Sequence, residues 1–212
     1  MPQILEINPV KPQDALIRRA VVVLQAGGVV AFPTETFYGL AADAMNGDAI
    51  ERIFAIKGRA FSNPIALIAG DKSGIGALVA EIPAAAQRLM QAFWPGPLTL
   101  LFSASFRISP RLTAGTGKIG IRVSSHPIAA GLARRLDGPI TATSANLSGA
   151  PECSTAAEVL ANLGDCVDLV IDGGATPGGQ GSTLFDITSD PPACLREGAI
   201  SRLIIQEALK NA

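Results

Sequence analysis

The sequence predicts a single-domain α/β protein in which helices flank a mixed β-sheet. Short β-rich segments bounded by turn residues alternate along the chain with segments of helical periodicity, as is typical of α/β folds. The chain has 212 residues, of which 48% are hydrophobic, so it can bury one substantial core. No internal repeat or linker-like tract divides it, and we therefore expect residues 1–212 to form one domain.

The N-terminal part is expected to form a strand and a helix. Ile4–Ile7 is a short β-rich run, and Pro12 suits the first turn of the following helix because the N–H that proline lacks would have no partner there. The apolar positions of that helix recur at helical spacing, at Leu16, Ala20, Val23 and Leu24. Gly27 and Gly28 end the helix, since glycine readily adopts the left-handed conformation.

The next stretch contains the residues around which we expect the chemistry to be organised. An apolar strand starts at Val29 and breaks at Pro33 into the polar loop Thr34–Thr36. A helix follows, ends at the basic turn Lys57–Arg59 and leads to a second apolar run from Pro64. In open α/β sheets ligands bind at the loops that follow strands. A cation pair beside a hydroxyl-rich loop suits an anionic ligand with several oxygens.

The rest of the chain continues the alternation. Helices are expected over residues 71–79, 83–94, 127–135, 155–163 and 201–209. Strands are expected over residues 98–102, 119–123, 139–143, 167–171, 182–187 and 193–196. Thr155 and Glu158 match a capping box, which marks the start of a helix. The whole chain then holds roughly eight strands and six helices.

Composition narrows the classes of function. The formal net charge of −1 argues against a general nucleic-acid coat but allows a local basic pocket. The N-terminal segment lacks the pattern of a signal peptide, and no run of about 18 residues is apolar throughout. The cysteines, Cys153, Cys166 and Cys194, fit ordinary thiols in a reducing compartment, and a single histidine rules out a His-pair metal site. We expect a cytoplasmic protein that does not enter membranes.

Several motifs have simple structural interpretations. Gly115–Gly120 matches the dinucleotide pattern G-x-G-x-x-G, but a β-like segment follows it instead of a helix, so we do not expect a Rossmann site. His126, which precedes a proline, is expected to start a helix and not to act as a catalytic base. Gly58 could cap a helix whose C-terminus favours the neighbouring cations. Residues 144–146 could form a turn in which side chains bond their own backbone, and residues 34–36 could cap a helix.

A series of short motifs, in order along nearly the whole chain, resembles the YrdC-type threonylcarbamoyl-AMP synthases. The motifs are Pro33–Leu40, Lys57–Arg59, Asn63–Pro64, Trp94–Thr99, Ile121–Val123, Ser144–Gly149, Ser182–Thr183 and Leu195–Gly198. The resemblance implies an open, twisted sheet around a concave cavity, in the short form without the extra C-terminal domain of longer synthases. It also implies a nucleotidyltransferase that joins L-threonine, bicarbonate or CO2, and ATP into threonylcarbamoyl-AMP and pyrophosphate, for modification of tRNA at position 37.

The resemblance also implies roles for individual residues. The family's K-x-R and S-x-N pairs, which line the nucleotide and the reacting centre, correspond to Lys57, Arg59, Ser144 and Asn146. The residues that resemble threonine or carbamate ligands are Thr34, Tyr38, Arg122 and Ser182. Lys118 and Arg196 resemble further nucleotide contacts. Downstream tRNA-modifying proteins would be partners, with at most weak RNA contact by this chain.

The residue types suit this reaction independently of the resemblance. A carbamate oxygen must displace pyrophosphate at the α-phosphorus, so two anions are driven together, and the protein has to position them and neutralise their charge. Mg²⁺ would be held mainly by the phosphates and by water, and we expect no protein metal site. We expect Lys57 and Arg59 to be exposed loop cations that contribute little to stability.

Three other functions are considered. A non-enzymatic RNA-binding module would need more aromatic stacking residues than one tryptophan and one tyrosine. A carbamoyltransferase of the hydrogenase-maturation type would need additional domains and zinc-binding cysteines. An inactive paralogue of the same fold would lose the K-x-R or S-x-N pair, and both pairs are intact here.

Overall fold

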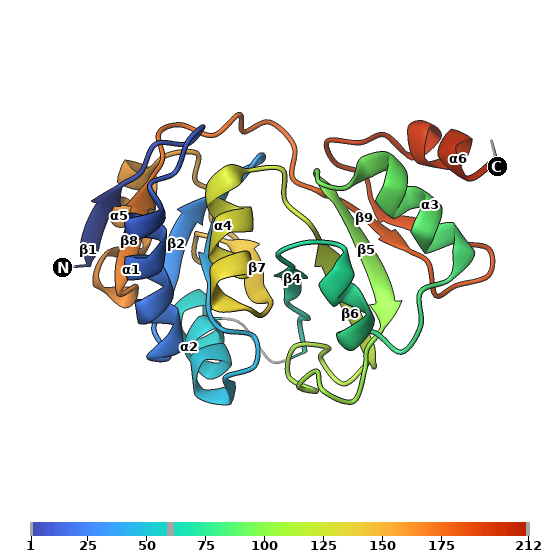
Figure 1. Ribbon diagram of the computed structural model, residues 1–212, viewed down its shortest axis with the longest axis horizontal. Helices are drawn as coiled ribbons and strands as arrows, with labels where there is room; N and C mark the ends of the chain where they lie inside the picture. The colour runs from blue at the N-terminus through green and yellow to red at the C-terminus, as the bar shows by residue number, and fades with distance from the viewer. Residues whose placement is uncertain (1, 59–61, 211–212) are drawn as a thin grey trace.

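The computed structural model describes residues 2–58 and 62–210, and its strands form one ten-stranded sheet (Figure 1). In chain order the strands are β1 (Gln3–Glu6), β2 (Val30–Pro33), β3 (Tyr38–Ala41), β4 (Ala66–Ile68), β5 (Leu98–Ser103), β6 (Lys118–Arg122), β7 (Ile140–Ser144), β8 (Leu169–Asp172), β9 (Thr183–Asp186) and β10 (Ala193–Arg196). Their order across the sheet is β1-β8-β2-β3-β7-β4-β6-β5-β9-β10. The sheet is open, because β1 and β10 lie at opposite edges.

Helices flank this sheet. They are α1 (Asp14–Gln25), α2 (Gly47–Lys57), α3 (Ala84–Phe93), α4 (Pro127–Leu136), α5 (Ala156–Leu163) and α6 (Arg202–Lys210), with short 3-10 segments at Ser73–Ala77 and Gly164–Cys166. The sheet contains parallel pairs, such as β4 with β6, and antiparallel pairs, such as β3 with β7, so the prediction of a mixed sheet is confirmed. Among the described residues, no helix has the length and hydropathy needed to cross a membrane.

The two faces of the sheet carry separate hydrophobic clusters. In β2, Val30 and Phe32 belong to the cluster under α1 and α4, whereas Ala31 belongs to the cluster on the other face. This alternation follows from the two-residue period of a strand. Figure 1 shows α1 and α4 side by side over β2, and the two helices contact each other. The opposite cluster takes in residues of α2, α3, α5 and α6.

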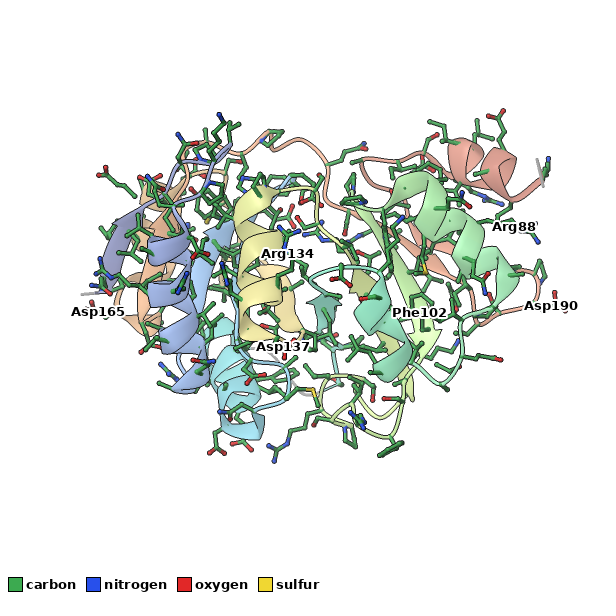
Figure 2. The ribbon with its side chains drawn as sticks, viewed as in Figure 1. Arg88, Phe102, Arg134, Asp137, Asp165 and Asp190 are labelled. Carbon is green, nitrogen blue, oxygen red and sulfur yellow. The ribbon has the colours of Figure 1, made fainter. Side chains whose placement is uncertain are left out.

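Side chains sort by polarity between the interior and the margin of the molecule. Figure 2 shows Phe102 within the region of β5 and α3, where its side chain is fully buried and its ring centre lies 6.4 Å from that of Trp94. Arg88, Asp165 and Asp190 lie at the outer margin and are exposed. The strand predicted over residues 98–102 is confirmed, since β5 spans Leu98–Ser103.

Two predicted elements are wrong. The polar loop at residues 34–37 leads into strand β3 and not directly into a helix, so it is a hairpin connection. Strand β3 (YGLA) is too short and too rich in small residues for its sequence to show alternation, although all of it is buried. Residues 71–79 form only a short 3-10 helix, because Gly74 and Gly76 disfavour an α-helix.

The first helix begins later than predicted. Gln13 is its N-cap, so Pro12 lies before the first turn. Its buried side chains are Ile17, Ala20, Val21 and Leu24, whereas the predicted Leu16 and Val23 are only half-buried. Two other predicted helix ends are confirmed. Gly27, after α1, has a φ of +80°, and Thr155 and Glu158 form the capping box at the start of α5. His126 is the N-cap of α4, where its ring nitrogen accepts the N–H of Ile128.

Candidate active site

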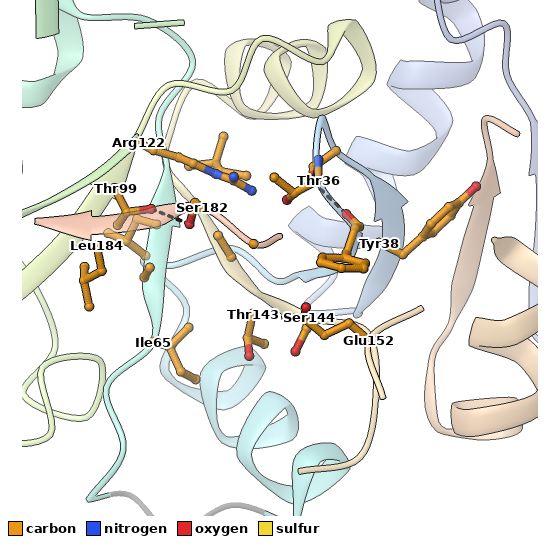
Figure 3. Close-up of a pocket in the computed structure, with 18 of the residues that line it drawn as sticks. Thr36, Tyr38, Ile65, Thr99, Arg122, Thr143, Ser144, Glu152, Ser182 and Leu184 are labelled. Atoms are coloured by element: carbon orange, nitrogen blue, oxygen red, sulfur yellow. Dashed lines mark hydrogen bonds between the residues drawn. The ribbon is translucent and has the colours of Figure 1, made fainter. Parts of the chain in front are cut away.

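A cavity of about 300 Å³ lies over the central strands of the sheet (Figure 3). Small side chains on neighbouring strands leave room for the cavity. Two cross-strand pairs of this kind line it, Gly39 with Ser144 and Ala66 with Ala142. A Cβ added to Gly39 would lie 3.2 Å from the ring of Phe32, which is tighter than ordinary packing. The size of the cavity is within the range of small-molecule sites.

One side of the cavity is formed by the hairpin loop that joins β2 to β3. The Thr34 hydroxyl donates to the carbonyl of Phe37 at 2.7 Å and accepts the backbone N–H of Thr36 at 3.1 Å. The two threonine hydroxyls lie 3.0 Å apart, and both residues line the cavity. The loop is therefore held by its own hydroxyls, and the interpretation of residues 34–36 as a helix cap is wrong.

The ammonium group of Lys57 is buried against the Ser144–Asn146 turn. Its Nζ donates to the carbonyl oxygens of Ser144 and Asn146 at 2.6 and 2.8 Å, and to Asn146 Oδ1 at 2.9 Å. Ser144 Oγ, at 3.3 Å, is a fourth oxygen in reach. Lys57 is only 4% exposed, so the prediction of an exposed loop cation is wrong for this residue. The structure brings three of the four residues of the K-x-R and S-x-N pairs into contact.

Local structure explains how this cluster is assembled. Asn46 caps the N-terminus of α2, and Gly58, with a φ of +56°, ends the helix directly after Lys57. The simpler interpretations of both motifs are also confirmed, since Gly58 is a helix cap and Ser144 Oγ donates to Asn146 Oδ1 within its own turn. Arg59 lies outside the described residues, and the structure does not place it.

At the other end of the cavity, Arg122 at the end of β6 is almost fully buried, with 7% of the residue exposed. Its Nη1 lies 3.1 Å from Glu35 Oε1, and the Ser124 hydroxyl donates to the other carboxylate oxygen of Glu35. Burial lowers the pKa of Arg122, an effect that Glu35 opposes and Arg196 reinforces. The guanidinium stays protonated because arginine does not titrate in the working range of proteins.

Two hydroxyls and a second arginine lie beside Arg122. Thr99 Oγ1 and Ser182 Oγ are 2.9 Å apart, and both residues line the cavity. Arg196 donates to the carbonyl of Ser182 at 2.9 Å and remains exposed at the rim. Arg122 and Ser182, which the resemblance assigns to the amino acid, thus lie at the same end of the cavity as Arg196, which it assigns to the nucleotide.

Two predicted site residues are placed differently. Lys118 begins β6 and forms an ion pair with Asp186 at 3.0 Å; it does not line the cavity. Along β6 it lies about 13 Å from Arg122. The Tyr38 hydroxyl donates to the Gly174 carbonyl at 2.7 Å and accepts the N–H of Gly173 at 3.3 Å. Tyr38 lines the cavity, but in Figure 3 its side chain points away from the other labelled residues, so the hydroxyl is not directed toward them.

The structure adds residues that motif reasoning missed. Thr36, Thr99 and Glu152 line the cavity, and Glu35 forms an ion pair with Arg122. The sequence could have indicated Thr99, because a polar residue between two buried leucines of one strand faces the opposite side of the sheet. For Glu35 the sequence offers no indication of a role beyond its place between two threonines. Within the described ranges, no three His, Cys, Asp or Glu side chains gather in a way that could hold a metal ion.

Comparison with known proteins gives concordant results. The family model Sua5_yciO_yrdC, described as "Telomere recombination", matches residues 22–198. Threonylcarbamoyl-AMP synthase of Bacillus subtilis is 41% identical over 197 residues, covering 92% of this chain and 57% of the relative. Threonylcarbamoyl-AMP synthase of Halorhodospira halophila is 37% identical over 157 residues, covering 74% of this chain and 82% of the relative.

Solved structures agree on the fold. Pyrococcus abyssi Sua5 in complex with L-threonine has a TM-score of 0.93 and 36% identity, covering 97% of this chain and 60% of that one. Escherichia coli YciO has a TM-score of 0.86 and 33% identity, covering 94% and 97%. The chain spans less than two thirds of the length of some of these relatives. The open mixed sheet with flanking helices around a cavity is thereby confirmed.

Proposed function

Because this chain belongs to the Sua5/YciO/YrdC family, we propose that it is an L-threonylcarbamoyladenylate synthase, a nucleotidyltransferase that acts as one YrdC-like domain. It takes L-threonine, bicarbonate or CO2, and ATP, and releases pyrophosphate. The observation that carries the proposal is one cavity with two chemically distinct ends. The Lys57–Ser144–Asn146 cluster borders one end, and Arg122 with Ser182 forms the other.

The end around Arg122 suits the amino acid. Arg122 and Arg196 bring two positive charges to this end of the cavity and Glu35 brings one negative charge, which leaves one positive charge in excess for the carboxylate of the substrate. Arg122 Nη1 is buried without an aligned hydrogen-bond acceptor among the described residues, and a buried donor of this kind favours an incoming oxygen. The Thr99–Ser182 hydroxyl pair can bond the hydroxyl or carbamate of threonine.

The end around Lys57 suits the reacting phosphate. Ser144 lines the cavity, and the buried ammonium beneath it supplies positive charge without reaching into solvent. A carbamate oxygen attacks the α-phosphorus here, the bond to the bridging oxygen of the β-phosphate breaks, and pyrophosphate leaves. Preorganised donors stabilise the charge that accumulates. Arg59 is assigned to the phosphates by family resemblance, and Lys118 can contact only a ligand that extends beyond the cavity.

Mg²⁺ accompanies ATP and neutralises its phosphates, so it enters as part of the substrate. The described carboxylates fit this arrangement, because Glu35 is committed to Arg122 and Ser124, and Glu152 is a single carboxylate on the cavity wall. The product is handed to separate tRNA-modifying proteins in the cytoplasm, with at most weak RNA contact by this chain, whose formal net charge is −1.

The test is to incubate the protein with ATP, Mg²⁺, bicarbonate and threonine, without RNA, and to detect threonylcarbamoyl-AMP by mass. Product should form at full rate without tRNA and should be lost when bicarbonate is omitted. Among amino acids, serine should work detectably less well than threonine, by roughly 10–200-fold, and valine should be close to background because it leaves a hydroxyl-bonding site unpaired. No product, or valine above serine, would contradict the assignment.

A further inference from the structure

The Glu35–Arg122 ion pair joins two parts of the sheet that are not neighbours. Glu35 lies in the hairpin loop between β2 and β3, whereas Arg122 ends β6. Strands β7 and β4 separate β3 from β6, which amounts to about 14 Å across the sheet. The Glu35 and Arg122 side chains are 13% and 9% exposed, and their charged atoms lie 3.1 Å apart. The loop therefore reaches across the sheet to meet the arginine at the end of the cavity.

The carboxylate of Glu35 is held from the other side by Ser124. The Ser124 hydroxyl donates to Glu35 Oε2, and Ser124 Oγ accepts the backbone N–H of His126 at 3.1 Å. His126 is the N-cap of α4, so this chain of contacts is tied to the start of a helix. Glu35 consequently has one oxygen bonded by Ser124 and one oxygen facing Arg122.

The contact with Arg122 is electrostatic and not an aligned hydrogen bond. Glu35 Oε1 and Arg122 Nη1 lie within ion-pair distance, yet among the described residues neither has a hydrogen-bond partner of good geometry. Figure 3 shows the Arg122 side chain reaching into the space between Ser182 and Thr36. Glu35 thus supplies a counter-charge while leaving the donors of the guanidinium for another acceptor.

We propose that Glu35, fixed by Ser124, is a positioning residue that orients Arg122 and balances its charge for the carboxylate of the amino-acid substrate. This inference rests on the proposed function. A buried arginine with no counter-charge is strongly disfavoured, and the nearby Arg196 would repel it further. With Glu35 in place, the guanidinium stays in the cavity and the local charge matches a single carboxylate.

The test compares Glu35→Gln, Ser124→Ala and the double variant with the wild type. Glu35→Gln should raise the KM for threonine by about 10–100-fold, the equivalent of one hydrogen bond to a charged group, while the KM for ATP stays within about twofold. Ser124→Ala should act in the same direction but more weakly, by about threefold. If Ser124 works through Glu35, the double variant should match Glu35→Gln, since residues in one network are not additive.

The matched control is Glu51→Gln, which breaks an ion pair with Arg111 between half-exposed side chains and should leave both KM values within about twofold. A Glu35→Gln protein that melts at a lower temperature but keeps the wild-type KM for threonine would overturn the proposal. The ion pair would then only stabilise the fold. An equal rise of both KM values would also overturn it. If Glu35→Gln does not fold, an unchanged threonine KM in Ser124→Ala is decisive against it. Failure of the wild type to make product contradicts the proposed function instead.

Discussion

Replacing Lys57 with methionine should destabilise the protein as well as stop its reaction. The ammonium has three N–H donors, and four oxygens of Ser144 and Asn146 lie within 2.6–3.3 Å of it. Methionine keeps a similar length and apolar stem but bonds none of these oxygens. The substitution therefore removes the hydrogen bonds of the turn without leaving a large cavity.

The magnitude follows from two opposing contributions. Each hydrogen bond to a charged group contributes about 1.5–3 kcal/mol, so three bonds would contribute about 4.5–9 kcal/mol. Removing the ammonium also removes the cost of burying it, which is several kcal/mol. A net loss of about 2–4 kcal/mol in the free energy of unfolding remains. For a chain of this size that corresponds to a fall in Tm of about 4–16 °C.

Thermal melting followed by circular dichroism measures this effect, with pyrophosphate release measured on the same samples. The control is Lys11→Met, in which an exposed lysine is lost and the free energy of unfolding should change by less than about 0.5 kcal/mol. Pyrophosphate release should fall by about a hundredfold or more in Lys57→Met, because the Ser144 turn would no longer be held at the cavity. A Tm within about 2 °C of the wild type would refute the claim that Lys57 organises this turn.

Two further predictions concern single side chains. Burial lowers the pKa of His126, with Glu35 opposing the shift, so the unfolded chain binds the proton more readily. The stability from neutral His126 is thus present above its unfolded pKa of about 6.5 and is lost as the pH falls through the folded pKa. His126→Asn, which keeps a good N-cap, should lose less Tm than the wild type between pH 7 and pH 5, and equal losses would contradict this. Burial also raises the pKa of Tyr38 to about 12. Tyr38→Phe should lose about 1–3 kcal/mol of stability while the threonine KM stays within about twofold; a tenfold rise would show that the hydroxyl reaches the substrate.

Much of the fold could be predicted because its signals are local. The capping box at Thr155 and the glycines at positions 27 and 58 each depend on a few neighbouring residues, and all are confirmed. Hydrophobic periodicity is just as local, but it was only partly right, because it predicted an α-helix over residues 71–79 where only a short 3-10 helix forms. Polar motifs at the end of a helix and at the end of a strand also indicated Lys57 and Ser144. Strand β3 was not predicted because a strand of four residues, two of them the small residues glycine and alanine, shows no clear period.

The amino-acid sequence by itself determined the α/β class, the family and several of the polar residues that border the cavity, since these follow from local pattern and motif order. Only the tertiary structure decided how those residues are used. It buried Lys57 against a turn far along the chain, paired Lys118 with Asp186, turned the Tyr38 hydroxyl toward Gly173 and Gly174, and brought Glu35 to Arg122. The physical reason is that periodicity fixes the face of a strand on which a side chain lies, whereas strand order and crossing loops depend on pairings between distant segments.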